Sequence, residues 1–136
     1  MPPPIRVELL PHDPAWTSAA VEAAAQLAKA LGDCLVAVHH IGSTAIPGIH
    51  AKPILDLMPV VCGLAALDAH RAAIEALGYQ WWGDYGLPGR RYCTWADPAT
   101  GRRRREIHCY MRGWREIVRH LGFRDEDIKL VKLLVD

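Results

Sequence analysis

Apolar positions along the chain change their spacing several times, and each change marks a predicted element. Between Pro14 and Leu31 they recur at helical intervals, and Gly32 follows as a residue that commonly ends helices. Asp13 and Pro14 suit the N-cap and the first helical position. The pattern predicts an alanine-rich helix over about Pro14–Leu31 that can pack closely on a sheet. Its apolar stripe consists of Trp16, Ala20, Ala24, Leu27 and Leu31.

Two apolar runs follow, Cys34–Ile41 and Pro53–Val61, and both are typical of buried strands. A loop of mostly small residues, Gly42–Gly48, separates them. Because successive side chains on a strand alternate between its faces, every second residue of the second run shares one face. These residues are Ile54, Asp56, Met58 and Val60.

The middle of the chain predicts a helix over Leu64–Leu77, which Gly78 ends, and then a hairpin. The hairpin joins strands Tyr79–Asp84 and Arg90–Trp95 through a turn at residues 85–89. Glycine and proline in that turn are the residues that reverse the chain between two strands.

The C-terminal part predicts one clear strand, Arg103–Met111, and helical spacing over about Trp114–Leu121 and Asp125–Asp136. A weak edge strand near residues 5–9 completes the set. Hairpins rule out an all-parallel sheet. The sequence therefore predicts an α/β (α+β) fold, a single domain over residues 1–136 with a mixed β-sheet and flanking α-helices.

Composition agrees with one globular domain and gives no strong electrostatic preference. Hydrophobic residues make up 51% of the 136 positions and charged residues 23%, which is the balance of a soluble domain with a core. The net charge of +1 disfavours nucleic acid and membrane surfaces as partners, and no apolar run approaches about 20 residues. Four cysteines without a CxxC pair, and no signal-peptide core, lead us to expect a reducing, cytoplasmic location.

Asp56 is the residue that the apolar pattern does not explain. A charge inside such a run costs several kcal/mol unless it is paired. One interpretation makes Asp56 a ligand of a hard cation such as Mg²⁺, with substrate phosphates completing the coordination. The other pairs it with Lys52 or with an arginine from another strand. Met58, two residues further on the same face, cannot bind Mg²⁺.

The loop before Asp56 also allows two interpretations. Backbone N–H groups of Gly42 and Ser43 can approach a phosphate closely, and the Ser43 and Thr44 hydroxyls can add donors. An ordinary tight turn is the simpler interpretation of the same residues. The phosphate interpretation gains weight because Asp56 follows on the adjacent predicted strand.

Three histidines and a glutamate are further candidates. Glu106 and His108 share a face of their strand, and they would meet Asp56 if the two strands were neighbours, as ligand and general base. His39 and His40 must point to opposite faces, so at most one joins a site, and a structural role is favoured for each.

Arginines cluster around the second hairpin turn, at Arg90, Arg91 and Arg102–Arg105. They can clamp an anionic ligand, or they can be solvated ends of the hairpin. Alternation leaves at most every other arginine facing one site, so solvated ends are favoured for most of them. No aromatic-rich RNA-binding motif accompanies them.

Several of these stretches together resemble a known family. HIGSTAIPG at His40–Gly48 and AKPILD at Ala51–Asp56 are its densest motifs, and Val7–Trp16, Ile107-His108 and His120–Asp125 extend the match over nearly the whole chain. In these residues the chain resembles the GrpB-like family, a branch assigned to the nucleotidyltransferase superfamily.

The resemblance implies a nucleotidyltransferase-like mixed sheet. In active members of the superfamily the Gly-Ser motif contacts nucleotide phosphates, two carboxylates one residue apart bind metal, and a third lies on a later strand. Gly42 and Ser43 match the first element and Asp56 the first carboxylate. Met58 stands where the second carboxylate would be expected, and Glu106 or His108 matches the third.

Two functions follow from this resemblance. The first is a nucleotidyltransferase in which Asp56, Glu106 and His108 are catalytic, Asp56 binds Mg²⁺, and further residues bind the phosphates. The second is a non-catalytic module that binds a nucleotide or a coenzyme-A-related molecule through a degenerate metal site. Some members look fused to dephospho-coenzyme-A kinase, and members usually continue into a longer C-terminal helix. The phosphate-binding residues implied are Gly42, Ser43, Thr44, Lys52, Arg91 and Arg124.

Overall fold

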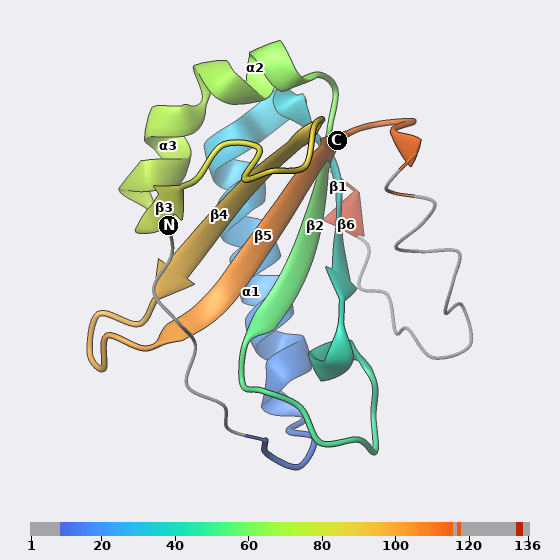
Figure 1. The fold of residues 1–136 in the computed structure, drawn as a ribbon, viewed down its shortest axis with the longest axis vertical. Coiled ribbons are helices and arrows are strands. Elements are labelled where there is room, and N and C mark those ends of the chain that lie inside the picture. The colour runs from blue at the N-terminus through green and yellow to red at the C-terminus, as the bar shows by residue number, and fades with distance from the viewer. Residues whose placement is uncertain (1–8, 116, 118–132, 135–136) are drawn as a thin grey trace.

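A computed structural model describes residues 9–115, 117 and 133–134 of the chain. The described residues form a six-stranded sheet in the order β3-β4-β5-β2-β1-β6, with the helices packed on one of its faces (Figure 1). The helices are α1 (Ala15–Leu31), α2 (Leu64–Ala69) and α3 (Arg71–Ala76). The strands are β1 (Leu35–Ile41), β2 (Leu55–Val61), β3 (Tyr79–Trp81), β4 (Arg90–Ala96), β5 (Arg103–Met111) and β6 (Leu133–Leu134).

The sheet is mixed because one pair of neighbours is parallel. β2 pairs in parallel with β5, whereas β1–β2, β1–β6, β3–β4 and β4–β5 are antiparallel. A parallel neighbour requires a crossover connection, and here α2, α3 and the β3–β4 hairpin lie between β2 and β5. The predicted α+β class with a mixed sheet and flanking helices is confirmed.

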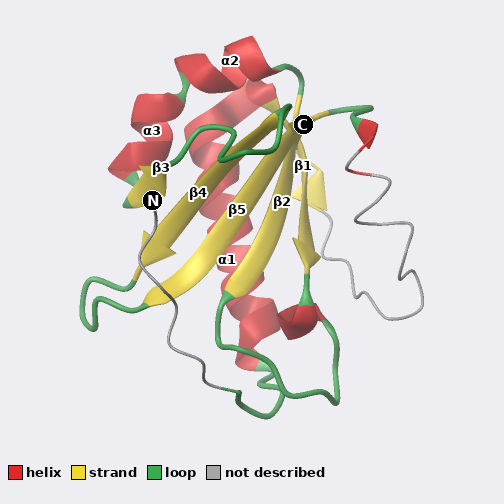
Figure 2. Ribbon diagram, in the orientation of Figure 1, coloured by secondary structure: helices red, strands yellow, loops and turns green. Residues whose placement is uncertain are grey.

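Helix α1 crosses behind the sheet and supplies one side of the main core (Figure 2). All five residues of its predicted apolar stripe are buried. The helix ends where predicted: Gly32 has a φ of 55°, and its N–H bonds to the Ala28 carbonyl. On the sheet side, alternation directs Leu57, Ile107 and Cys109 towards the helices.

The single helix predicted over Leu64–Leu77 is wrong, because the chain breaks it at His70 into α2 and α3. The His70 Nδ1 bonds to the Ala66 carbonyl at 2.8 Å, the group that a continuous helix would offer to the His70 N–H. That N–H bonds instead to Leu67 O, one residue closer, so the turn tightens. Leu67 and Ile74 remain fully buried on either side of the break.

The strand predictions differ from the structure mainly at their ends. β1 and β2 begin one and two residues later than predicted, and β5 coincides with the predicted Arg103–Met111. β3 is shorter than predicted, although the Trp82 N–H still bonds to Tyr92 O. The predicted helical segment Asp125–Asp136 and most of the one at Trp114–Leu121 lie outside the described residues, as does the edge strand near residues 5–9.

The other face of the sheet carries a small apolar cluster and, beside it, polar side chains. Ile41, Met58 and Tyr110 form that cluster, and Leu87 and Trp114 pack against it. Among the described helices, none has the length and hydropathy needed to cross a bilayer. The candidate residues gather on this open face.

Replacing Leu27 with alanine should lower the free energy of unfolding by about 2–5 kcal/mol, because its fully buried side chain would leave a cavity. Val21→Ala in the same helix is the matched control. Val21 is 40% exposed, so that change should cost about 0.5 kcal/mol or less. Urea titration followed by circular dichroism measures both, and equal losses would show that α1 does not pack as described.

Candidate functional site

Three of the predicted residues converge on the open face of the sheet. The parallel register places Asp56 of β2 directly beside Glu106 of β5, and alternation puts His108 on the same face. One ligand atom from each side chain lies within 4.8 Å of the others. The strand pairing that the sequence left open therefore joins these residues, which we call the carboxylate site.

Asp56 has a partner within this group. The His108 Nε2 lies 3.3 Å from Asp56 Oδ1, and the two side chains are 17% and 28% exposed. The contact is an ion pair when the imidazole is protonated. The partner found here is a histidine, whereas the sequence suggested Lys52 or an arginine.

Glu106 is fixed by neighbours on β4 and on its own strand. The Tyr92 hydroxyl donates a hydrogen bond to Glu106 Oε1 at 2.8 Å, and Arg103 Nη1 donates to the same oxygen at 3.3 Å. The ring of Tyr92 also lies against that of His108, with centroids 5.2 Å apart. These contacts hold the Glu106 carboxylate close to Asp56.

Bringing two carboxylates together affects their protonation. Burial, and next the negative charge of Asp56, raise the pKa of Glu106. Burial, and next the hydrogen bond to Glu106, raise the pKa of Tyr92, so its hydroxyl remains a donor. A proton or a bound cation would relieve the repulsion between Asp56 and Glu106.

The loop after β1 approaches this site so closely that it requires a glycine. Gly42 has a φ of +76°, and a Cβ built on it would lie 2.7 Å from Asp56 Oδ2. The next residues, Ser43–Ala45, form one 3₁₀ turn in which the Ala45 N–H bonds to Gly42 O. The loop is thus a tight turn, and it lies beside Asp56 as the phosphate interpretation also requires.

A pocket of about 320 Å³ opens between this loop, the segment before β2 and the two carboxylates. It brings together four predicted residues, and its lining adds others that the sequence reasoning missed. His50 lies outside the strands, so alternation along a strand gives no signal for it. The lining residues are Leu9, Ser43, His50, Ala51, Lys52, Ile54, Asp56 and Glu106.

Other predicted phosphate-binding residues are not among this lining. Thr44 is fully buried, and its hydroxyl lies 2.9 Å from the Nε2 of His40 in the core. Arg91 contacts both oxygens of Asp68, at 2.7 and 3.0 Å, near α2 on the helix-covered side, so we leave it out of the site. Arg124 lies outside the described residues.

The structure also places Met58 and the histidine pair. Met58 is fully buried in the apolar cluster with Ile41 and Tyr110, and it lies opposite His39 on β1. The adjacent His40 pairs with Leu57, whose side chain faces the helices. The two histidines therefore point to opposite faces, as alternation predicts, and both are buried.

Tyr92 and Arg103 are the contacts that sequence reasoning missed. Tyr92 lies opposite His108 across the β4–β5 pair, and Thr94 lies opposite Glu106. The antiparallel register determines these neighbours. The hairpin pattern in the sequence predicts that the strands pair, but it does not determine their register.

Comparison with known proteins gives consistent matches. A family model described as GrpB protein matches residues 6–126. The UPF0157 protein YqkA of Bacillus subtilis is 35% identical over 123 residues, which cover 90% of this chain and 35% of that protein. The UPF0157 protein PA4798 of Pseudomonas aeruginosa is 34% identical over 122 residues, which cover 88% of this chain and 49% of that protein. The chain thus spans about a third to a half of the length of these two curated relatives.

One solved structure and one partial match add to this picture. The crystal structure of the conserved protein GrpB from Enterococcus faecalis aligns with a TM-score of 0.80 and 35% identity, covering 87% of this chain and 70% of that chain. A dephospho-CoA kinase of Mycolicibacterium paratuberculosis is 38% identical over 76 residues, which are 54% of this chain and 19% of that protein.

Gly42→Ala should destabilise the fold by at least about 1 kcal/mol more than Gly48→Ala, because only at Gly42 does the added Cβ collide with Asp56. Gly48 is the matched control: its φ of +84° carries the same backbone strain, and a Cβ added there would meet nothing within 4 Å. Chemical denaturation of both variants measures the difference. Equal destabilisation would contradict the close approach of the loop to Asp56.

Glu106→Gln should flatten the dependence of stability on pH. The pKa of the Glu106 carboxyl group is higher in the folded than in the unfolded chain. Such a group contributes most to the free energy of unfolding below its unfolded pKa, and this stabilisation is lost as pH rises through the folded pKa. The wild type should therefore lose stability relative to Glu106→Gln as pH rises above about 4.3, the usual pKa of an unfolded glutamate, and through the raised folded pKa. Thermal unfolding in the presence of a chelator measures both proteins, and parallel pH profiles would contradict the raised pKa.

Proposed function

The chain belongs to the GrpB family, and from that premise we propose that the pocket beside Asp56 and Glu106 binds a phosphorylated small molecule of the nucleotide type together with one divalent cation. The observation that carries this proposal is the convergence of Asp56, Glu106 and His108, the first two of which line that pocket. Three potential ligands from two adjacent strands are held in place by backbone pairing rather than by a flexible loop.

The donor set fits a divalent cation. Two carboxylates and one imidazole, with ligand atoms within 4.8 Å of one another, supply negative charge and three donors from the protein. Carboxylate oxygens suit Mg²⁺ and Mn²⁺, whereas imidazole is more often a ligand of Zn²⁺ or Fe²⁺. The mixed donor set therefore supports a transition-metal ion such as Mn²⁺ at least as strongly as the Mg²⁺ that the resemblance suggests.

The remaining lining suits a phosphate. Lys52 supplies a compact positive charge and Ser43 a hydroxyl donor, both at the pocket that Asp56 and Glu106 line. A cation held by the carboxylates would share the phosphate oxygens with these two groups. The glycine at Gly42 allows the loop to lie directly against the Asp56 carboxylate.

Nucleotidyl transfer is a second candidate, and the position of Glu106 favours it. In this alternative Glu106 is not a ligand of the cation, and its raised pKa and fixed orientation suit a group that takes the proton of an attacking hydroxyl. The hydroxyl oxygen would bond to the α-phosphorus while the bond to pyrophosphate breaks. Met58 lies where the superfamily pattern has a second carboxylate, so one-cation binding is the primary proposal and transfer the secondary one.

The partial match to a dephospho-CoA kinase guides the choice of ligands to test. Coenzyme A and dephospho-coenzyme A combine a nucleotide with phosphates, so both belong to the proposed ligand class. They are probes beside ATP and the other nucleoside triphosphates.

Calorimetry with ATP or dephospho-coenzyme A should detect binding in the presence of Mn²⁺ or Mg²⁺, and a chelator should abolish it. Asp56→Asn should weaken this binding at least about tenfold, because it removes a ligand charge next to Glu106. Asp33→Asn is the matched control, since Asp33 is an exposed carboxylate outside the pocket.

Two outcomes would contradict the proposal: no cation-dependent binding of any probe to the wild type, or equal affinity in Asp56→Asn. Transfer is tested in the same samples by release of pyrophosphate from each nucleoside triphosphate. Cation-dependent binding without pyrophosphate release would leave the binding module as the function and exclude nucleotidyl transfer with the substrates tested.

A further inference from the structure

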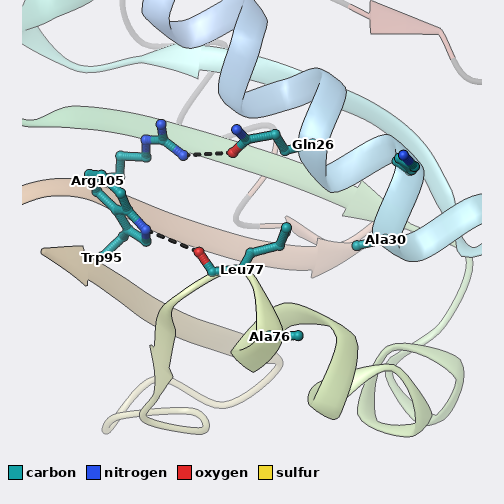
Figure 3. A pocket seen from close by; sticks show the side chains of 7 residues that line it. Gln26, Ala30, Ala76, Leu77, Trp95 and Arg105 are labelled. Carbon is teal, nitrogen blue, oxygen red and sulfur yellow. Dashed lines mark hydrogen bonds between the residues drawn. The ribbon is translucent and has the colours of Figure 1, made fainter. Parts of the chain in front are cut away.

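A second hollow, of about 490 Å³, lies on the helix-covered side of the sheet, away from the carboxylate site. Figure 3 shows it between α1, the end of α3 and the strands β4 and β5. Arg105 contributes to its wall, whereas the next residue, Glu106, belongs to the carboxylate site. Because neighbouring strand residues point to opposite faces, the two pockets lie on opposite sides of the same strand. We call this second pocket the Arg105 hollow.

The guanidinium of Arg105 is held in place by neutral groups. Arg105 lies opposite Trp95 in the β4–β5 pair, and its guanidinium carbon is 4.2 Å from the centroid of the indole ring. Its Nη1 donates to Gln26 Oε1 on α1 at 3.0 Å. These two contacts fix the plane of the guanidinium at one end of the hollow, as Figure 3 shows.

The indole that supports Arg105 is itself fixed. The Trp95 Nε1 donates to the Leu77 carbonyl at 3.1 Å, at the end of α3. Gly78 leaves room for this contact, since a Cβ built there would lie 2.8 Å from the same nitrogen. The Arg105–Trp95 pair is thus preorganised, and a ligand would not have to order it.

The described lining of the hollow is positively charged. It contains two cations, Lys29 and Arg105, and no carboxylate among the residues that the structure describes. Among the described residues, Arg105 makes no ion pair with an acidic group, although it is half-buried. A guanidinium has five N–H donors, and the hydrogen bond to Gln26 engages one of them, so donors remain for an anion.

The rest of the lining is apolar. Ala30 from α1, Ala76 and Leu77 from α3 and the indole of Trp95 line the hollow beside the two cations. Its volume lies in the range of small-molecule sites, about 300–1,000 Å³. A ligand that fits both features carries a negative charge at one end and a small apolar body at the other.

We propose that the Arg105 hollow binds a small organic carboxylate with an aromatic or short aliphatic body. The carboxylate accepts hydrogen bonds from Arg105 and forms an ion pair with Lys29, and the apolar body packs on Leu77 and the two alanines. Carboxylate–guanidinium pairs are favourable because both groups are planar and can share two parallel hydrogen bonds. This site is independent of the proposed function, since it shares no residue with the carboxylate site.

Titration with sodium benzoate, followed by ¹H–¹⁵N NMR, tests the proposal. The indole N–H signal of Trp95, assigned by comparison with Trp95→Phe, should shift saturably. Benzamide, which has the same body without the charge, should bind at least about tenfold more weakly, because it loses the charge-assisted hydrogen bonds. Inorganic phosphate should also bind more weakly than benzoate, because it has no apolar body to bury.

Variants locate the binding. Arg105→Gln should weaken the binding of benzoate at least about tenfold. Lys29→Glu should abolish the shift by placing a carboxylate beside Arg105, and because Lys29 is exposed this variant tests the proposal even if Arg105→Gln does not fold. Lys52→Gln, a neutralised lysine in the other pocket, is the matched control and should leave benzoate binding unchanged.

Each other outcome overturns the proposal. No saturable shift of the Trp95 signal at millimolar benzoate would show that Arg105 serves only to support the indole. Equal binding of benzamide would remove the role of the cations, and equal or tighter binding of phosphate would remove the role of the apolar wall. Unchanged binding in Lys29→Glu would place the benzoate elsewhere on the protein.

Discussion

The structure depends on the parallel pairing of β2 with β5. These strands are far apart in the sequence, and their register sets Asp56 beside Glu106. The same pairing determines what lies between them, because a parallel neighbour cannot follow through a tight turn. The chain therefore completes α2, α3 and the β3–β4 hairpin before it returns to the centre of the sheet. Both halves of the sheet, β3–β4 on one side and β1 with β6 on the other, extend outwards from this central pair.

Local patterns were sufficient to predict the elements and their faces. The stripe of α1 and the alternation along β2 and β5 follow from single-residue periods, and the structure matches them at Leu27, Met58 and Ile107. What local patterns could not supply is which strands are neighbours. His108 as the partner of Asp56 follows only once β2 and β5 are known to be adjacent.

Side chains that compete with the backbone, or that find partners far along the chain, explain the remaining errors. At the break, the imidazole of His70 forms a hydrogen bond with a carbonyl of the preceding helix. The periodic pattern of apolar residues does not predict this contact. Arg91 was grouped with arginines near a turn, whereas its position one residue before Tyr92 sends it to the opposite face, where Asp68 binds it. Thr44 looked like a free hydroxyl donor in a polar loop, but it folds inwards onto His40.

The alternation of β5 has a consequence for how the chain tolerates insertions and deletions. From Arg105 onwards, odd positions such as Arg105 and Ile107 serve the helix side, and even positions such as Glu106 and His108 serve the open side. Gaining or losing one residue inside β5 would exchange these sets, placing acidic and imidazole groups in the core and apolar groups beside Asp56. The turn at residues 97–101 can absorb a change of length because its residues are mostly exposed. The two pockets share no side chain, but both depend on the same alternation of side chains along β5. Length variation along β5 is therefore expected only at its ends.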